Sequence, residues 1–243
     1  MKRCAIILGH VDGHLSTNLD MKRVYDFLVS CNGGAWDSDE IIKKANATRR
    51  EVIELFDNTR AERFDYVFFY FSGHGGYKRG TVVELNPTGE ILSEAELVGL
   101  GSRQLNIFDC CRKPDEEGIV KESMSFSMDS LWEDESRHRA YCRHLFENRT
   151  MLAAPQEMSL YACSIGEYAN DTNNGGIYTK HLINAACNVE EEYLLASAAH
   201  DSAYLSTVVE STSYGQVQHP DYFMAKLPSR LQLVIAVNAN KSL

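Results

Sequence analysis

Apolar runs alternate with helix-like segments along this 243-residue chain. The most informative run is Tyr66 to Phe71, which is apolar or aromatic throughout, as expected for a strand that is covered on both faces. Shorter candidate strands lie at 4–9, 104–111 and 159–164. Because parallel strands need crossover connections, this alternation predicts an α/β fold, with a mostly parallel sheet and helices on both faces.

Helices and further strands are predicted from apolar spacing and from capping and turn signals. A short strand at 81–85 belongs to a small hairpin, and a last strand lies at 230–238. Five segments have helical spacing or a helix-starting capping box. They are 18–30, the segment after the Thr48–Glu51 capping box, the short segment that the Ser93–Glu96 capping box begins, 175–186 and 203–212.

The middle of the chain differs from both ends in composition and in periodicity. Residues 113–150 are rich in Asp, Glu, Ser and Arg and have no clear period, which predicts a long surface connection with one short helix. We therefore expect a single domain over 1–243, made of a first part at 1–112, this linker, and a last part at 151–243.

Composition restricts the class of protein. The formal net charge of −10 argues against a general nucleic-acid binder or an anionic-membrane binder, since both need a basic surface. No window approaches the roughly 18 apolar residues of a membrane-spanning helix, and the apolar stretch from Cys4 to Leu8 is too short for a signal peptide. A cytoplasmic protein is expected, with most of its seven cysteines reduced.

Reactive side chains follow two of the predicted strands. His74 lies in the stretch Ser-Gly-His-Gly-Gly at 72–76, and a cysteine pair ends the stretch Phe-Asp-Cys-Cys at 108–111. Ligands of open α/β sheets bind beyond the carboxyl ends of the strands. The two stretches therefore predict a site at one sheet edge, although a lone histidine in a glycine turn is more often structural.

The pair Cys110–Cys111 has several interpretations. Adjacent cysteines fit poorly with a metal site or a dithiol redox motif, because both favour separated sulfurs. Buried packing is the main alternative to a nucleophile, since free cysteine is among the most buried residue types. Neighbours on a strand point to opposite faces, so at most one sulfur faces His74.

Taken together, Ser72-Gly73-His74-Gly75 and Asp109-Cys110-Cys111 resemble the two catalytic motifs of the caspase and metacaspase superfamily. The flanking sequence is similar to the small bacterial caspase-like (orthocaspase) type over nearly the whole chain. The resemblance implies a caspase-like fold, in which a central six-stranded sheet is flanked by helices. It also implies a cysteine endopeptidase that uses a Cys-His dyad.

The resemblance assigns roles residue by residue. Cys111 is the expected nucleophile and His74 the general base and then acid. The backbone N–H groups of Gly75 and Cys111 are expected to form the oxyanion hole, while Cys110 takes the position of a small residue facing away. An adjacent imidazole favours the thiolate, the reactive form of cysteine.

Three further residues are expected to form the first substrate pocket, S1: Asp20, Asp109 and Ser72. Two carboxylates in one partly buried pocket favour cleavage after Arg or Lys. The competing structural roles are a helix-dipole acid for Asp20 and a turn former for Asp109. The partner is accordingly a protein or peptide substrate with a basic P1 residue, the residue before the cleaved bond.

Expectations about regulation and cofactors come only from the family resemblance. Self-processing in 113–149 is expected, with Arg137, Arg139, Arg143 and Arg149 as acceptable sites, and an activating protease or regulatory protein is another expected partner. No cofactor or metal is predicted. The acids at 115–117 and 133–135 could bind calcium, but a solvated charged loop is the favoured interpretation of these residues.

The sequence departs from the metacaspase pattern in two places. Residues 112–116 replace the usual His-Ser-Gly after the nucleophile, and Ile165 stands at a usual Asp position. The alternative function is therefore a catalytically silent caspase-like interaction or regulatory module.

Overall fold

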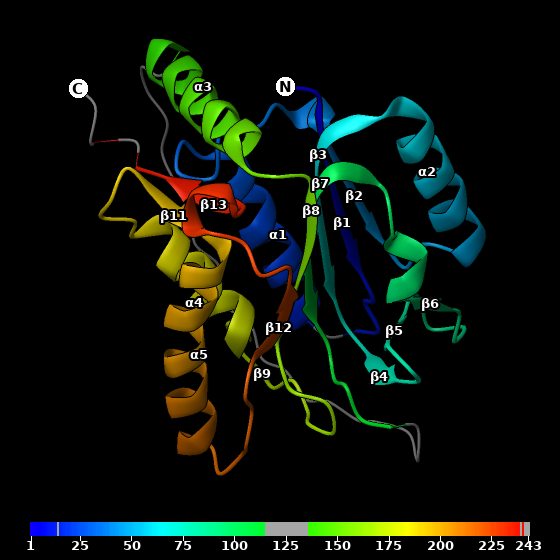
Figure 1. The fold of residues 1–243 in the computed structure, drawn as a ribbon. Coiled ribbons are helices and arrows are strands. Elements are labelled where there is room, and N and C mark those ends of the chain that lie inside the picture. The colour runs from blue at the N-terminus through cyan, green and yellow to red at the C-terminus, as the bar shows by residue number, and fades with distance from the viewer. Residues whose placement is uncertain (14, 115–135, 239, 241–243) are drawn as a thin grey trace.

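A computed structural model describes residues 1–13, 15–114, 136–238 and 240, with only the backbone at 136 and 137. Within that part of the chain, the centre is a six-stranded sheet in the order β12-β8-β7-β3-β1-β2, in which β12 alone is antiparallel to its neighbour (Figure 1). This confirms the mostly parallel sheet expected from the sequence. Its strands are β1 Arg3–Gly9, β2 Ile41–Ala45, β3 Phe64–Ser72, β7 Gly101–Asp109, β8 Gln156–Tyr161 and β12 Asp221–Met224.

Helices cover both faces of this sheet. Helix α2 lies on one side, and α1, α4 and α5 lie on the other (Figure 1). The α-helices of the described residues are α1 Leu15–Val29, α2 Arg49–Glu62, α3 Ser136–Leu152, α4 Ile177–Cys187 and α5 Ala196–Ser213. Short 3₁₀ turns are η1 Ser38–Glu40, η2 Glu94–Leu97 and η3 Ser229–Leu231.

Three small sheets surround the central one. The expected small hairpin is part of a three-stranded antiparallel sheet: β4 Gly75–Tyr77, β5 Thr81–Glu84 and β6 Ile91–Ser93. The others are two-stranded: β9 Asp171–Thr172 with β10 Gly175–Gly176, and β11 Tyr193–Leu195 with β13 Val234–Val237.

Strand β3 is buried on both faces, as its unbroken apolar run predicts. Phe68 and Tyr70 pack into the core beneath α1 and α4. Phe69 and Phe71 pack into the separate core beneath α2 and β5. The sheet thus divides the interior into two cores, and the alternation of side chains along β3 assigns each ring to one of them.

Helix α2 begins where the capping box predicts. The Thr48 side chain accepts the Glu51 N–H, and the Glu51 carboxylate accepts the Thr48 N–H at 2.8 Å. Two backbone donors of the first turn are thereby satisfied. Val52 and Phe56, one turn apart, are both fully buried against the sheet.

The last strand expected from the sequence is β13, which pairs with β11 in a small sheet, while the edge strand of the central sheet is β12. The second half of the expected linker forms the 17-residue helix α3, which is longer than the one short helix expected there. Strand β12 escaped notice because its edge position leaves Phe223 70% exposed, without the pattern of a covered strand.

Helix α5 packs on α4 through a buried histidine. The Tyr178 hydroxyl and His200 Nδ1 are 2.8 Å apart, and burial lowers the pKa of His200 to about 4. The folded protein therefore excludes a proton that the unfolded chain binds below pH about 6.5. The free energy of unfolding should fall by about 3 kcal/mol as pH drops from about 6.5 to about 4.

Urea denaturation over this pH range tests the expectation. The fall should be much smaller in His200→Gln, while the exposed-site control His144→Gln should keep the wild-type fall. A His200→Gln profile parallel to that of wild type would contradict it.

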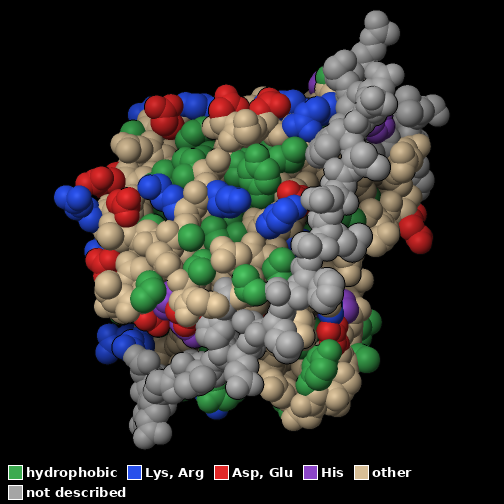
Figure 2. All heavy atoms as spheres, turned by 180° about the vertical axis from the view of Figure 1, so that it is seen from behind, with side chains coloured by type: hydrophobic (Ala, Val, Ile, Leu, Met, Phe, Trp, Pro, Cys, Tyr) green, Lys and Arg blue, Asp and Glu red, His purple; other side chains and the backbone are tan. Residues whose placement is uncertain are grey.

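Charged side chains are intermixed on the face opposite to the view of Figure 1. On the described residues there, acidic and basic side chains surround small groups of exposed apolar ones (Figure 2). Across the described residues, none of the helices combines the length and the apolar character that crossing a membrane requires.

Candidate active site

The two strands that end in reactive residues are neighbours in the sheet. Strands β3 and β7 pair in parallel up to Ser72 opposite Asp109. Contact continues past the strand ends, since the Gly73 N–H donates to the Asp109 carbonyl at 3.1 Å and the Tyr77 N–H donates to that of Lys113 at 2.8 Å. His74 and Cys111 each follow the last register pair by two residues, so they lie on adjoining segments at the carboxyl edge.

The cysteine pair faces two different cores. Cys110 belongs to the core beneath α2, and its Sγ lies 2.7 Å from where a Cβ on Gly75 would stand. Cys111 belongs to the opposite core, and its Sγ is 3.8 Å from the Ala169 carbonyl oxygen. Strand alternation thus separates the sulfurs as expected, and only a glycine at 75 leaves room for Cys110.

His74 contacts the end of the first strand. Its Nε2 is 2.7 Å from Asp12 Oδ2, and its ring is edge-on to His10, with centroids 4.8 Å apart. Gly73 has φ of +144° and would bring a Cβ to 2.7 Å from the His10 Cβ, so glycine permits this approach. Asp12 was missed in the sequence, although its position just beyond β1 was the available signal.

An Asp12→Asn variant tests whether this carboxylate orients His74. Because it is partly exposed and therefore screened, we expect a fall in kcat of about 10-fold with little change in KM. Asp39→Asn, an exposed acid far along the chain, is the control. Unchanged steady-state kinetics for Asp12→Asn would show that the contact does not support catalysis.

The three expected pocket residues lie together. Asp20 is fully buried on α1, and its Oδ2 accepts the Ser72 hydroxyl at 3.3 Å and the Gly176 N–H at 2.8 Å. Asp109 is 2% exposed at the end of β7, and its carboxylate raises the pKa of Asp20 electrostatically. The fold therefore gathers residues 20, 72 and 109 from three separate elements.

Asp109 also has a structural role. Its Oδ2 accepts the backbone N–H of Thr179 at 3.1 Å and the Thr179 hydroxyl at 2.6 Å. Thr179 is the third residue of α4, which follows the N-cap Gly176. The carboxylate thus caps a helix that offers no capping side chain of its own. Thr179 could not be inferred from sequence, since it lies 70 residues from Asp109.

Burial is the main influence on the charge state of Asp20. It raises the pKa of this carboxyl well above its ordinary value, and the neighbouring Asp109 and Asp171 raise it further. The Gly176 N–H and Arg23 act in the opposite direction. These residues form an acidic cluster whose charge a further cation would stabilise.

A guanidinium already contacts this cluster. Arg23 Nη1 donates to Asp20 Oδ1 at 2.8 Å, and its Nη2 donates to the Asn174 carbonyl at 2.6 Å. The Arg23 side chain is 24% exposed, whereas Asp20 is fully buried. Arg23 therefore lies on the solvent side of Asp20.

A glycine pair closes over both carboxylates. A Cβ on Gly175 would lie 2.2 Å from Asp20 Oδ1, and one on Gly176 would lie 2.3 Å from Asp109 Oδ2. Gly175 also has φ of +91°, a conformation that favours glycine. Only residues without side chains allow the β9–β10 turn to pack this closely on the acids.

A second segment covers the cysteine. The Arg112 N–H donates to the Glu167 carbonyl at 3.1 Å, and the Gly166 N–H donates to the Arg112 carbonyl at 2.9 Å. Arg112 is itself anchored: its guanidinium lies 3.8 Å from the Tyr161 ring centroid and donates to Asp221 Oδ2 at 3.1 Å. Cys111 is consequently only 1% exposed.

Two further acids near the candidate site pair with other side chains. Glu167 Oε1 is 2.7 Å from His219 Nδ1, and Asp171 Oδ2 accepts the Ser16 hydroxyl at 3.0 Å. The acids 115–117 and 133–135, considered as calcium ligands, lie outside the described residues.

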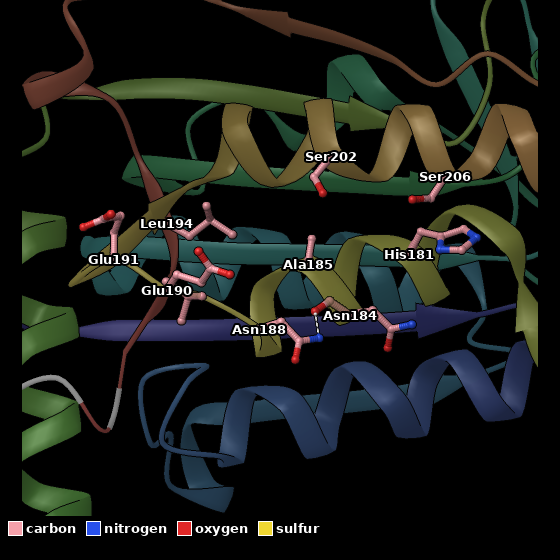
Figure 3. A pocket seen from close by; sticks show the side chains of 10 residues that line it. His181, Asn184, Ala185, Asn188, Glu190, Glu191, Leu194, Ser202 and Ser206 are labelled. Atoms are coloured by element: carbon pink, nitrogen blue, oxygen red, sulfur yellow. Dashed lines mark hydrogen bonds between the residues drawn. The ribbon is translucent and has the colours of Figure 1, made fainter.

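A separate hollow of about 450 Å³ lies between α4 and α5, where His181, Asn184 and Ser202 line it (Figure 3). None of the residues that line it belongs to the candidate site.

Comparisons with known proteins agree with the fold. The family model described as the caspase domain of the peptidase C14 class matches residues 2–231. A caspase-1 crystal structure from Spodoptera frugiperda is similar in fold, with a TM-score of 0.61 at 10% sequence identity, covering 91% of this chain and 86% of that one. A search of curated protein sequences gives no significant match.

Proposed function

Because the chain belongs to the caspase domain family, we propose that it is a cysteine endopeptidase of the small metacaspase-like type, in which Cys111 attacks the substrate and His74 transfers its proton. The observation that carries this is the alignment of β3 and β7. Their paired ends bring His74 and Cys111 to adjoining segments at the edge where α/β sheets bind ligands.

The chemistry follows from the residue types. The Cys111 thiol gives its proton to His74, and the thiolate adds to the scissile carbonyl. Backbone N–H groups of Gly75 and Cys111 are the proposed donors to the oxyanion. His74 then protonates the leaving amine, and water hydrolyses the acyl-enzyme. Asp12, at 2.7 Å from Nε2, is the proposed positioning residue for the imidazole.

The acidic cluster supports cleavage after Arg or Lys. Ser72 ends β3, Asp109 ends β7 two residues before the proposed nucleophile, and Asp20 of α1 accepts the Ser72 hydroxyl. The contact of Arg23 with Asp20 supports the same conclusion, because it is a guanidinium–carboxylate pair at 2.8 Å. A substrate arginine or lysine would bind the same carboxylates.

Access to this site requires two segments to move. Cys111 is covered by the segment around Gly166 and Glu167, and both aspartates are covered by the Gly175–Gly176 turn. We therefore propose that the described conformation is a resting one, and that substrate, an activating protease or a regulatory protein displaces these segments. The activator is a protein partner of unspecified identity.

Self-processing is proposed at Lys121 rather than at the arginines of 137–149. Those arginines lie in helix α3, where Arg139 donates to the carbonyls of Val29 and Trp36 and Arg149 is buried. A protease needs an extended chain, which a helix does not offer. Lys121 is the one basic residue of the sequence between 115 and 135.

Mass spectrometry of the incubated protein tests this site. Wild type should yield fragments ending at Lys121, and Lys121→Gln and Cys111→Ala should both stay intact. Lys113→Gln, a change of the nearest basic residue before this segment, should not protect the chain. Fragments ending at Arg139 or Arg143 would contradict the assignment.

The proposed activity is tested with fluorogenic peptides that differ only in P1. Arg and Lys peptides should be hydrolysed, and an Asp peptide should not. A silent binding module, the alternative function, would hydrolyse none of them, and its Cys111 would alkylate no faster than a small free thiol. The intact His74 and Cys111 favour the enzyme.

A further inference from the structure

We propose that Cys31, His138 and Cys142 form a zinc site that fastens helix α3 to the turn after α1. The ligand atoms of these three residues all lie within 4.8 Å of one another. His138 and Cys142 are four residues apart on α3, so they share one helix face. Cys31 comes from the turn that follows α1, more than 100 residues earlier.

The spacing fits a tetrahedral zinc ion. With zinc bonds of about 2.3 Å to sulfur and about 2.0 Å to nitrogen, a sulfur and a nitrogen ligand should be about 3.5 Å apart. Cys142 Sγ and His138 Nε2 are 3.7 Å apart. The ion could enter with little movement of either side chain.

A second cluster with metal-binding residue types lacks this spacing. His10, Asp12 and His74 also lie within 4.8 Å of one another. However, His74 Nε2 and Asp12 Oδ2 are 2.7 Å apart, which is a hydrogen-bond distance. Nitrogen and oxygen ligands on one tetrahedral zinc would be about 3.3 Å apart. This cluster is better described as a hydrogen-bonded histidine.

The three ligands are held on a rigid base. Arg139 donates to the carbonyls of Val29 at 2.6 Å and Trp36 at 2.5 Å, which joins α3 to both ends of the turn that carries Cys31. Phe146 packs so closely on Gly34 that a Cβ there would lie 2.5 Å from its ring. Such second contacts fix ligand geometry before the metal arrives.

The donor set selects the metal by its chemistry. Two thiolates and an imidazole suit zinc, cadmium or copper(I) rather than calcium or magnesium. On binding, the two thiols release their protons, and the resulting thiolates balance the ion's two positive charges. Water would complete the tetrahedron as a fourth ligand.

The ligands of the proposed zinc site come from both sides of residues 115–135. Cys31 lies before residues 115–135, and His138 and Cys142 lie after them. A zinc ion would therefore bridge the parts of the chain on either side of that segment, independently of whether the peptidase assignment is correct. If the chain is cut at Lys121, as proposed above, zinc would help to keep the two fragments together.

Metal analysis of the full-length protein tests the proposal. Protein purified with thiol reductant and without chelator should contain about one zinc per chain, and Cys31→Ser and His138→Asn should each lose most of it. Two matched controls should keep theirs: His144→Asn, an exposed histidine on the same helix, and Cys187→Ser, an exposed free cysteine. Cys111→Ala should also keep it, which separates this site from the dyad.

Cobalt and alkylation provide tests that do not depend on the folding of variants. Cobalt added to metal-free wild type should give the thiolate-to-cobalt charge-transfer band of a tetrahedral sulfur site. Zinc should protect Cys31 from iodoacetamide at least about 10-fold, with Cys187 labelled equally in both samples. At about a 100-fold excess over its Kd, zinc should raise the Tm of wild type by about 5–10 °C.

The opposite results would overturn the proposal. These are equal zinc in wild type and Cys31→Ser, a cobalt spectrum without the thiolate band, or no protection of Cys31. A Cys31–Cys142 disulfide in place of metal under the same reducing conditions would also overturn it.

Discussion

Cys111→Ala should lower kcat/KM for an arginine-P1 peptide by at least about 10⁴-fold, because removing a nucleophile leaves only binding and oxyanion stabilisation. Cys110→Ala should keep kcat/KM within about threefold of wild type. The reason is geometric: the Cys110 sulfur points into the core beneath α2 and packs on Gly75. The measurement is steady-state hydrolysis of one fluorogenic arginine peptide by the three proteins.

The Cys110 variant needs a stability control. Truncating a fully buried side chain should cost about 1–2 kcal/mol of the free energy of unfolding. Assays should therefore run well below the Tm of each variant. Equal losses of activity in two folded variants would contradict the assignment of Cys111, and a larger loss in Cys110→Ala would reverse it.

Asp20→Asn should lower kcat/KM for arginine and lysine peptides by about 30- to 150-fold, while a peptide with a neutral P1 residue changes little. The lost interaction is a buried charge-assisted pair, which is worth about 2–3 kcal/mol. Asparagine is nearly isosteric, so its side-chain oxygen can still accept the Gly176 N–H. The Arg-to-neutral ratio of kcat/KM is the measurement.

The control for this variant lies on the same helix. Asp26 is exposed on α1 and pairs with Lys22 at 2.6 Å, so Asp26→Asn removes an acid without touching the cluster. It should leave the ratio unchanged. If Asp20→Asn also leaves the ratio unchanged, the acidic cluster is structural and does not select the substrate.

The pH dependence of the same ratio follows from Asp20. Burial raises its pKa, so the carboxyl stays protonated above the ordinary value of about 3.9. Preference for arginine over a neutral P1 residue should increase as pH rises through the raised pKa and the carboxylate forms. This step should disappear in Asp20→Asn. If Asp20→Asn shows the same pH-dependent increase in the ratio, a group other than Asp20 is responsible for it.

As pH rises through the raised pKa of Asp20, the free energy of unfolding should fall, whereas the preference for arginine should increase. A raised folded pKa means that the folded protein holds a proton which the unfolded chain releases. The Asp20 contribution to the free energy of unfolding is therefore present below pH about 3.9 and is lost as pH rises through the folded pKa. A bound basic side chain would offset that loss by pairing with the carboxylate.

The central part of the fold was predictable because its signals are local. The apolar run of β3 and the Thr48 capping box each depend on a few adjacent residues. The rule that ligands bind at carboxyl ends then located His74 and Cys111 on one edge. Alternation along a strand was sufficient to separate the two sulfurs.

The remaining features depend on contacts between distant residues. Helix α3 is polar by sequence, and its Arg143 is paired with Asp37 and Glu40 about 100 residues away. The glycine turn over the acids reaches Asp20 from 156 residues further along the chain. The spacing of Cys31 from Cys142 carries no motif, so this cluster emerges only in the folded chain.

One labelling experiment identifies the nucleophile and the preferred P1 residue together. An arginyl chloromethyl ketone is incubated with the protein, and peptide mass spectrometry locates the adduct; Cys187 is the exposed cysteine available for nonspecific reaction. We predict an adduct on Cys111, formed faster than with an aspartyl reagent and suppressed in Asp20→Asn. Preferential labelling of Cys187, or faster reaction of Cys111 with the aspartyl reagent, would contradict it.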